Sequence, residues 1–321
     1  MTLEHYRRET SVGIAIVALN VVLAFKAVGF FTLANLTDLL LANMPVLIVA
    51  LGMTLVILAG QIDISVGSVF AVCSVASGML AKSGLPTVAA GLASCAIGAC
   101  FGAMNGALVA YLRIPSIIVT LAAMVALRDG LRWVTQGAWV ENLPSNFQWF
   151  GLSQPASQAL TFSLALTLVT LTAWSLRNIK AGRAVYATGS NEDAARLAGI
   201  NPALVTFSVF VITGMLTGCA ALLNSVRFDQ IPSNTGLGLE LKVIAVVVLG
   251  GAAITGGRGT VLGTLLGWVL LGMIGPALTF LGVSAYWESA IHGTIILVAV
   301  AADSLRVRSG RNAGNLATSG A

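Results

Sequence analysis

The chain is a series of long apolar runs separated by short polar or glycine-rich breaks. Most of these runs hold about 20 residues, the length that an α-helix needs to cross the hydrocarbon core of a bilayer. We therefore predict an all-α, polytopic integral membrane protein with about ten transmembrane helices and a short cytoplasmic helix. The predicted spans cover residues 12–31, 40–60, 64–82, 86–111, 116–135, 157–176, 204–224, 239–256, 260–281 and 287–304.

Composition agrees with a location in the bilayer. Hydrophobic residues make up 57% of the 321 residues and charged residues only 9%, whereas soluble domains carry about 25% charged residues. The 17 Lys and Arg residues exceed the 12 Asp and Glu residues, and membrane proteins collect such cations on the cytoplasmic side. Because no basic run is interleaved with aromatic residues, nucleic acid is not an expected partner.

The positions of Lys and Arg predict the orientation. Arg113, Arg177, Lys180 and Arg183 fall on the same side as both termini when the spans are numbered in order. The positive-inside rule therefore places both termini in the cytoplasm. Residues 1–308 are expected to form one transmembrane domain, and the small, polar residues 309–321 are expected to form a disordered cytoplasmic tail.

The longest predicted cytoplasmic loop, about 177–203, contains the polar stretch 182–200, which ends in "YATGSNEDAARLAGI". Ser190 and Asp193 have the spacing of a capping box, and either Ser190 or Asn191 is expected to cap a helix. Gly199 is placed to end it. The stretch predicts a helix of about two turns outside the membrane. Such a helix is marginal alone, so it docks either on its own spans or on a partner.

A second polar break, "AGQIDISVGS", separates the second and third predicted spans. Carboxylates at membrane depth face protein or water. Asp63 therefore either lies beside a translocation cavity or caps the next helix through the amides of Ser65 and Val66. Both interpretations remain open from the sequence.

Two further patterns concern packing and hydrogen bonding inside the membrane. The small residues Gly91, Gly98, Gly102 and Gly106 lie close to one helical face, which favours close approach of another helix. Neutral hydrogen-bonding side chains near the spans are suited to a sugar, which carries many hydroxyls and little charge. These side chains are Asn43, Asn105, Thr120 and Asn224.

Enzymatic chemistry has little support in the sequence. No GxxxxGK[ST] phosphate loop is present, so nucleotide binding requires a separate subunit. We find no paired carboxylates, no His with a partner and no metal-ligand cluster. The cysteines Cys73, Cys95, Cys100 and Cys219 lie in apolar segments and are expected to be packing residues. No catalytic residue, metal or cofactor is predicted.

Four blocks, in order, resemble one family. "QIDISVGS", "MNGALVAYLRIPSIIVTLA", "YATGSNEDAARLAGI" and "GLELKVIAVVVLGGAAITGGRGTVLGTLLG" are similar to segments of the ribose-type sugar permeases of ATP-binding-cassette (ABC) importers. The resemblance covers nearly the whole chain. Within the family, "GAWVENLP" and the "YATGSNEDAARLAGI" block resemble the branch that imports rhamnose or the autoinducer-2 furanose.

This resemblance implies a non-catalytic permease subunit of the bacterial inner membrane. It would form the path for a monosaccharide, with rhamnose as the best guess, delivered by a periplasmic sugar-binding protein. The expected partners are cytoplasmic ABC ATPase subunits and a second permease, in a homodimer or heterodimer. The helix in the cytoplasmic loop would be the coupling helix that docks on the ATPase.

The coupling candidates are carried over from the family motif residue by residue, whereas the path candidates are the polar side chains of the break and of the neighbouring spans. The coupling residues are Gly189, Asn191, Glu192, Asp193, Arg196 and Gly199. The path candidates are Asp63, Ser65, Asn105 and Thr120.

Two other classes of protein share some of these features. The main alternative is a proton- or sodium-coupled secondary sugar transporter, and the third class is a membrane enzyme. Secondary transporters place ionisable residues at the membrane midplane, whereas most charges here fall near the ends of predicted spans.

Overall fold

The structure is a computed structural model that describes residues 4–284, 286–295, 297 and 298. Helices dominate this part of the chain, and one isolated antiparallel bridge joins Val140 to Ile231. The prediction of an all-α, polytopic membrane protein is confirmed. The predicted tail, 309–321, and the end of the last predicted span lie outside the described residues.

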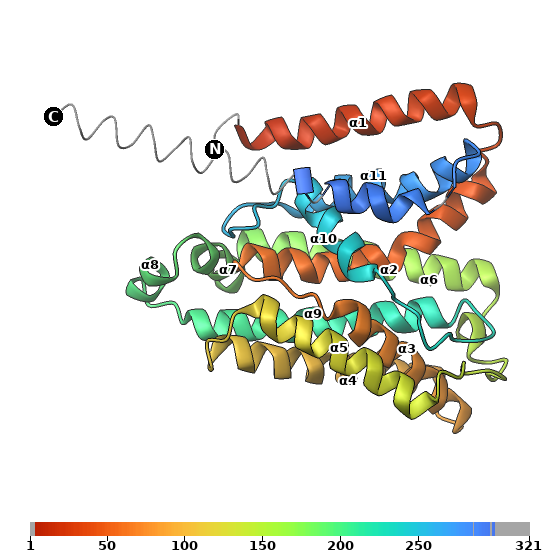
Figure 1. The fold of residues 1–321 in the computed structure, drawn as a ribbon, viewed down its shortest axis with the longest axis horizontal. Coiled ribbons are helices and arrows are strands. Elements are labelled where there is room, and N and C mark those ends of the chain that lie inside the picture. Colours follow the sequence, from red (N-terminus) through yellow and green to blue (C-terminus); the bar gives the residue numbers. More distant parts are fainter. Residues whose placement is uncertain (1–3, 285, 296, 299–321) are drawn as a thin grey trace.

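The helices form one elongated bundle (Figure 1). Their bounds are α1 Glu4–Lys26, α2 Leu33–Leu58, α3 Val66–Lys82, α4 Thr87–Ala110, α5 Ser116–Thr135, a 3-10 turn Gln148–Gly151, α6 Gln154–Asn178, α7 Lys180–Ser190, α8 Glu192–Leu197, α9 Pro202–Ser225, α10 Leu239–Leu249 and α11 Val261–Phe280. Residues 287–295 are also helical.

Five of the described helices are long and apolar enough to cross a membrane by themselves, namely α2, α4, α6, α9 and α11. They differ in position within the bundle. In α2, 89% of the most apolar window is buried inside the protein, against 17% in α6. Helix α2 is therefore a central span, whereas α6 is a peripheral span whose apolar side chains face lipid.

Helices α4 and α9 pack antiparallel along a line of glycines. Gly98 of α4 lies against the Gly214 carbonyl, and Gly102 lies against the Phe210 carbonyl. The hydroxyl of Ser94 donates to the Gly218 carbonyl at 2.9 Å. The small residues let the two backbones touch, which confirms the close packing predicted from the glycine spacing in α4.

The predicted span 239–256 is wrong in extent, because α10 ends at Leu249 after 11 residues. The chain then turns through Gly251, Gly256, Gly257 and Gly259, all with positive φ, and such conformations end helices. At 1.5 Å per residue, α10 is about 17 Å long, roughly half of a bilayer core.

Helix α3 also begins at a buried position, and its start meets the start of α10. Gly67 lies against the Glu240 carboxylate, and both Val66 and Glu240 are buried. Arg128 of α5 is buried as well and donates to the Thr235 carbonyl at 3.0 Å. The starts of the short helices α3 and α10 therefore meet inside the protein, where the irregular backbone before each helix is covered by neighbouring helices.

Candidate functional site

The polar loop predicted from the sequence forms two helices at one end of the bundle (Figure 1, left). Helix α8, Glu192–Leu197, falls where a short helix was predicted. Helix α7, Lys180–Ser190, was not predicted. Asn191 separates them with an extended backbone, φ −162° and ψ 108°. The segment is therefore a helix pair with a sharp corner.

Asn191 caps α8 in the predicted way. Its Oδ1 accepts a hydrogen bond from the Ala194 amide at 3.0 Å. The alternative capping box is wrong, because Ser190 is the last residue of α7. Glu192 and Asp193 occupy the first turn, which is favourable at the positive end of a helix dipole.

Two further predicted coupling residues, Arg196 and Gly199, are exposed at the end of α8. Arg196 forms an exposed ion pair with Glu192 at 2.9 Å. Gly199 follows the helix with φ +80° and open space around it, as expected of a residue that ends a helix.

Leu197 is an apolar residue of this helix that the sequence analysis missed. Its side chain is 90% exposed, although three of the six residues of α8 are charged. A leucine in a polar, helix-forming loop is the signal that could have identified it. An isolated exposed leucine is ordinary on a protein surface, but this one lies on the helix that already carries the docking prediction.

Gly189 joins α7 to the end of α2. A Cβ at position 189 would collide with the Leu58 carbonyl, and a Cβ at Gly256 would lie 2.7 Å from the Gly189 oxygen. The amide of Gly257 donates to the same Leu58 carbonyl at 2.9 Å. The end of α7, the end of α2 and the loop after α10 therefore meet backbone to backbone, which only glycine permits.

A second contact ties α7 to the same loop. The Tyr186 hydroxyl donates to the Gly259 carbonyl at 2.9 Å. Burial raises the pKa of Tyr186, so the hydroxyl stays protonated and remains a donor.

A polar pocket of about 460 Å³ lies under α8. The charged side chains of Glu192, Asp193 and Arg196 form one wall, and Arg113, in the turn between α4 and α5, forms another. Gln61, the first residue of the "QIDISVGS" block, also lines it. Helix α8 and the break between α2 and α3 thus face the same space.

The four path candidates lie together around this break. Ser65 donates to Asp63 Oδ1 twice, from its amide at 2.9 Å and from its hydroxyl at 2.6 Å. Asn105 Nδ2 donates to the Ser65 hydroxyl at 2.8 Å. Of the two amides predicted as capping partners, Asp63 binds that of Ser65. Helix α3 begins at Val66 without a side-chain cap, so the prediction that Asp63 caps this helix is wrong.

Thr120 completes the group from α5. Its hydroxyl donates to the Ser116 carbonyl at 2.8 Å, and the Ser116 hydroxyl accepts from the Ile62 amide at 3.2 Å. Asp63, Ser65, Asn105 and Thr120 are all buried. These contacts fix the extended backbone of the break, and a role in the path stays a prediction.

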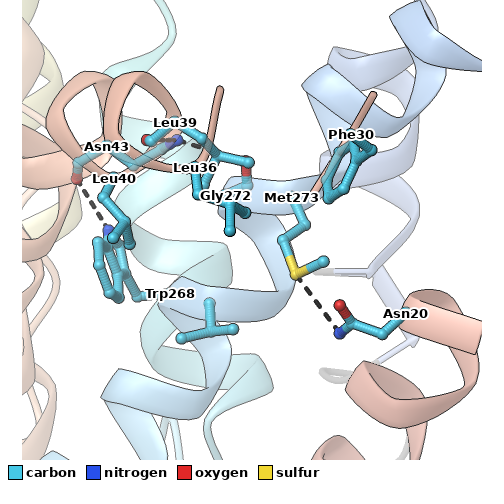
Figure 2. A pocket seen from close by; sticks show the side chains of 10 residues that line it. Asn20, Phe30, Leu36, Leu39, Leu40, Asn43, Trp268, Gly272 and Met273 are labelled. Carbon is cyan, nitrogen blue, oxygen red and sulfur yellow. Dashed lines mark hydrogen bonds between the residues drawn. The ribbon is translucent and has the colours of Figure 1, made fainter. Parts of the chain in front are cut away.

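Asn43 has a structural role in a different place. Figure 2 shows a mainly apolar pocket of about 210 Å³ between α1, α2 and α11. The Trp268 indole donates to the Asn43 carbonyl at 2.8 Å, and the Asn43 side chain donates to the Gly272 carbonyl at 3.3 Å. The Asn43 amide group is thus used to join α2 to α11.

Among the described residues, no group of three or more His, Cys, Asp or Glu side chains could hold a metal ion. The four cysteines are free thiols. The described part offers hydrogen-bonding side chains at the break and the exposed, charged helix α8.

These features define a class: a polytopic, all-α membrane protein in which an exposed helix pair is joined directly to buried spans. A family described as the permease component of the branched-chain amino acid transport system matches residues 35–300. The chain belongs to this family of membrane-embedded transport permeases.

Several relatives are similar over most of their length. The autoinducer 2 import system permease protein LsrC of Enterobacter sp. (strain 638) is 37% identical over 292 residues, 90% of this chain and 84% of the relative. The ribose import permease protein RbsC of Escherichia coli (strain K12) is 35% identical over 297 residues, 91% of this chain and 92% of the relative. The predicted resemblance to sugar permeases is confirmed. No solved structure matches the chain.

Proposed function

We propose that the protein is the permease subunit of an ATP-driven importer of the bacterial inner membrane and carries a monosaccharide delivered by a periplasmic binding protein. The observation that carries the proposal is the exposed helix α8, which is joined through Gly189 to the end of α2 and shares a pocket with Gln61. A movement of α8 would therefore shift the end of α2 and the break between α2 and α3.

The proposed orientation places α7 and α8 in the cytoplasm, with both termini on the same side. Cytoplasmic ABC ATPase subunits would dock on α8, with Leu197 as the apolar contact and Asn191, Glu192, Asp193 and Arg196 as polar contacts. A second permease subunit, identical or related, would complete the transporter. ATP hydrolysis belongs to the ATPase subunits, so this chain is a non-catalytic partner.

The proposed substrate class is supported by the names of the relatives. Those names specify ribose and autoinducer 2. Rhamnose, suggested by the sequence blocks alone, is the third candidate. We place Asp63, Ser65, Asn105 and Thr120 at the border of the path, where their hydrogen bonds hold the break in a fixed shape and leave sugar selectivity to the binding protein.

The test is uptake by vesicles that contain the permease with its ATPase and binding-protein partners. Labelled ribose, autoinducer 2 and rhamnose are offered separately, with ATP and a protonophore present. We expect uptake of one sugar under these conditions. A matched vesicle carries a chain in which residues 190–198 are replaced by a Gly/Ser linker, and this chain should insert normally but neither bind the ATPase nor transport.

A secondary transporter remains the competing function, favoured by the buried ionisable side chains Asp63, Arg128 and Glu240. Intramembrane charges of this kind form proton relays in such proteins. Uptake that fails with ATP and protonophore but returns with a proton gradient would replace our proposal with this one. Normal ATPase copurification with the 190–198 linker would also contradict the assignment of α8.

A further inference from the structure

A mainly apolar groove of about 400 Å³ lies on the outside of the bundle, beside α7. It runs between the C-terminal end of α6, the body of α7 and the first half of α9. The apolar side chains that line it are Leu55, Leu176, Val185, Leu204, Val205 and Ile212. None of the coupling or path residues discussed above contributes to this groove.

The groove opens toward lipid. Helix α6 is the peripheral span, with only 17% of its apolar window buried. Leu204 is 53% exposed and Ile212 is 38% exposed. From Leu204 to Ile212 the groove follows α9 for about 12 Å toward the membrane interior.

The mouth of the groove is positively charged. Lys180 lines it, and Arg177 and Arg183 flank Lys180 at equal spacing in the sequence. The sequence holds no Asp or Glu between Glu141 and Glu192. No ion pair is found for these three cations in the described part of the chain.

Two further observations locate the mouth at the membrane surface. Helix α7 begins at Lys180 without a side-chain cap, so its first amides and its dipole add positive potential there. Trp174 of α6 is 57% exposed, and exposed tryptophans of membrane proteins lie at headgroup level.

We propose that this groove binds a phospholipid with an anionic headgroup, with one acyl chain along α9 and the phosphate at Lys180 and Arg183. Basic pockets between spans on the cytoplasmic side are suited to anionic lipids. A second copy of the chain is a poorer occupant, because a twofold contact would bring the same cations against each other. Only the assignment to the cytoplasmic leaflet rests on the proposed function.

Bound lipid would support the coupling segment. The groove joins α6, α7 and α9, and α7 is held against α6 at Gly182, where a Cβ would collide with the Ser175 carbonyl. A lipid in the groove would therefore steady α7, the helix that joins α6 to α8.

The test uses the full-length permease purified from mixed vesicles of phosphatidylglycerol and phosphatidylcholine, and native mass spectrometry counts the lipids that stay bound. We expect preferential retention of phosphatidylglycerol. The charge variant K180Q/R183Q should lose this preference by about thirtyfold in affinity. The matched control K26Q/K82Q removes two exposed cations from the ends of α1 and α3 and should retain it.

A second variant, Ser208→Phe, fills the groove without changing charge. Ser208 lines the groove and donates only to Leu204, within its own helix, so the variant should fold and yet retain less lipid. Equal retention by K180Q/R183Q and its control, or full retention by Ser208→Phe, would overturn the proposal, as would displacement by inorganic phosphate. Because retention is measured on the permease alone, a failure of ATP-driven uptake would not affect this result.

Discussion

The α4–α9 interface and the α7–α8 segment use glycine in opposite ways. In the interface, Gly98 and Gly214 are in backbone contact, and the residues around them are buried. In the segment, Gly199 has no atom within 4 Å of a Cβ position, and Leu197 is exposed. Glycine in the first region sets the distance between helices, whereas in the second it only ends a helix.

The two regions contribute to different properties: the α4–α9 interface stabilises the bundle, and the α7–α8 segment offers a surface for recognition by a partner. The buried interface is specified by backbone shape, so an added methyl group there must move a whole helix. The exposed segment is specified by its surface side chains, which a partner can contact without any change in the bundle. Gly182 and Gly189 are exceptions, because they belong to this segment but are packed like residues of the interface.

The largest effect is expected for Gly214→Leu. The new side chain would meet the Gly98 carbonyl carbon at 2.8 Å and Gly102 Cα at 3.1 Å, so α4 and α9 must separate. We expect a loss of about 3 kcal/mol or more in stability, measured as a loss of monodisperse protein in size-exclusion chromatography. Gly130→Leu in α5, with open space around it, is the control. A normal profile for Gly214→Leu would refute the interpretation of this interface.

Gly189→Ala should have the next largest effect. Its Cβ would collide with the Leu58 carbonyl, so α7 must shift away from the end of α2 at a cost of about 2 kcal/mol. We expect ATP-driven uptake to fall strongly while the chain still inserts. The neighbouring variant Ser190→Ala should transport normally, and transport at the wild-type rate by Gly189→Ala would show that this junction carries no coupling.

Leu197→Asp tests recognition alone. The side chain is exposed, so the permease should keep its thermal stability. Burial of a leucine in a partner contributes about 1.5–3 kcal/mol, so ATPase affinity should fall at least about tenfold. Binding is measured by copurification over a range of ATPase concentrations. Leu152→Asp, in an exposed loop outside α8, should bind normally, and unchanged binding by Leu197→Asp would remove Leu197 from the interface.

The smallest effect is expected for Glu192→Gln. The ion pair with Arg196 is exposed, with side chains 52% and 60% accessible, and such helix pairs contribute about 0.3–0.5 kcal/mol. Circular dichroism and thermal melting of the purified permease should be unchanged. A large loss of ATPase binding with unchanged melting would identify Glu192 as a direct contact with the partner.

Patterns within short stretches of the sequence predicted the features that depend on residues close together in the chain, namely spans, a helix cap and a helix face. The apolar runs located most of the spans, and the sequence around Asn191 located both α8 and its cap. The spacing of Gly98 and Gly102 predicted a close helix contact, because residues four apart lie on one helical face. It did not identify α9 as the neighbour.

The remaining features depend on contacts between distant segments. Gly189 belongs to a polar loop of the sequence, but its contact is with Leu58, which is 131 positions earlier in the sequence. Arg128 falls in the last half of the predicted span 116–135, but it is buried against the segment that precedes α10. Neither contact could be predicted from a single apolar run of the sequence, because hydropathy indicates the length of a span but does not indicate which helices pack against it.

The shortness of α10 has a consequence for biosynthesis. A segment of 11 residues that carries Glu240 and Lys242 is too short and too charged to enter the bilayer by itself. It must therefore be held during membrane insertion by the helices that it packs against, chiefly α11 and α2. The order in which the spans leave the translocon is thus part of what makes the broken helix possible.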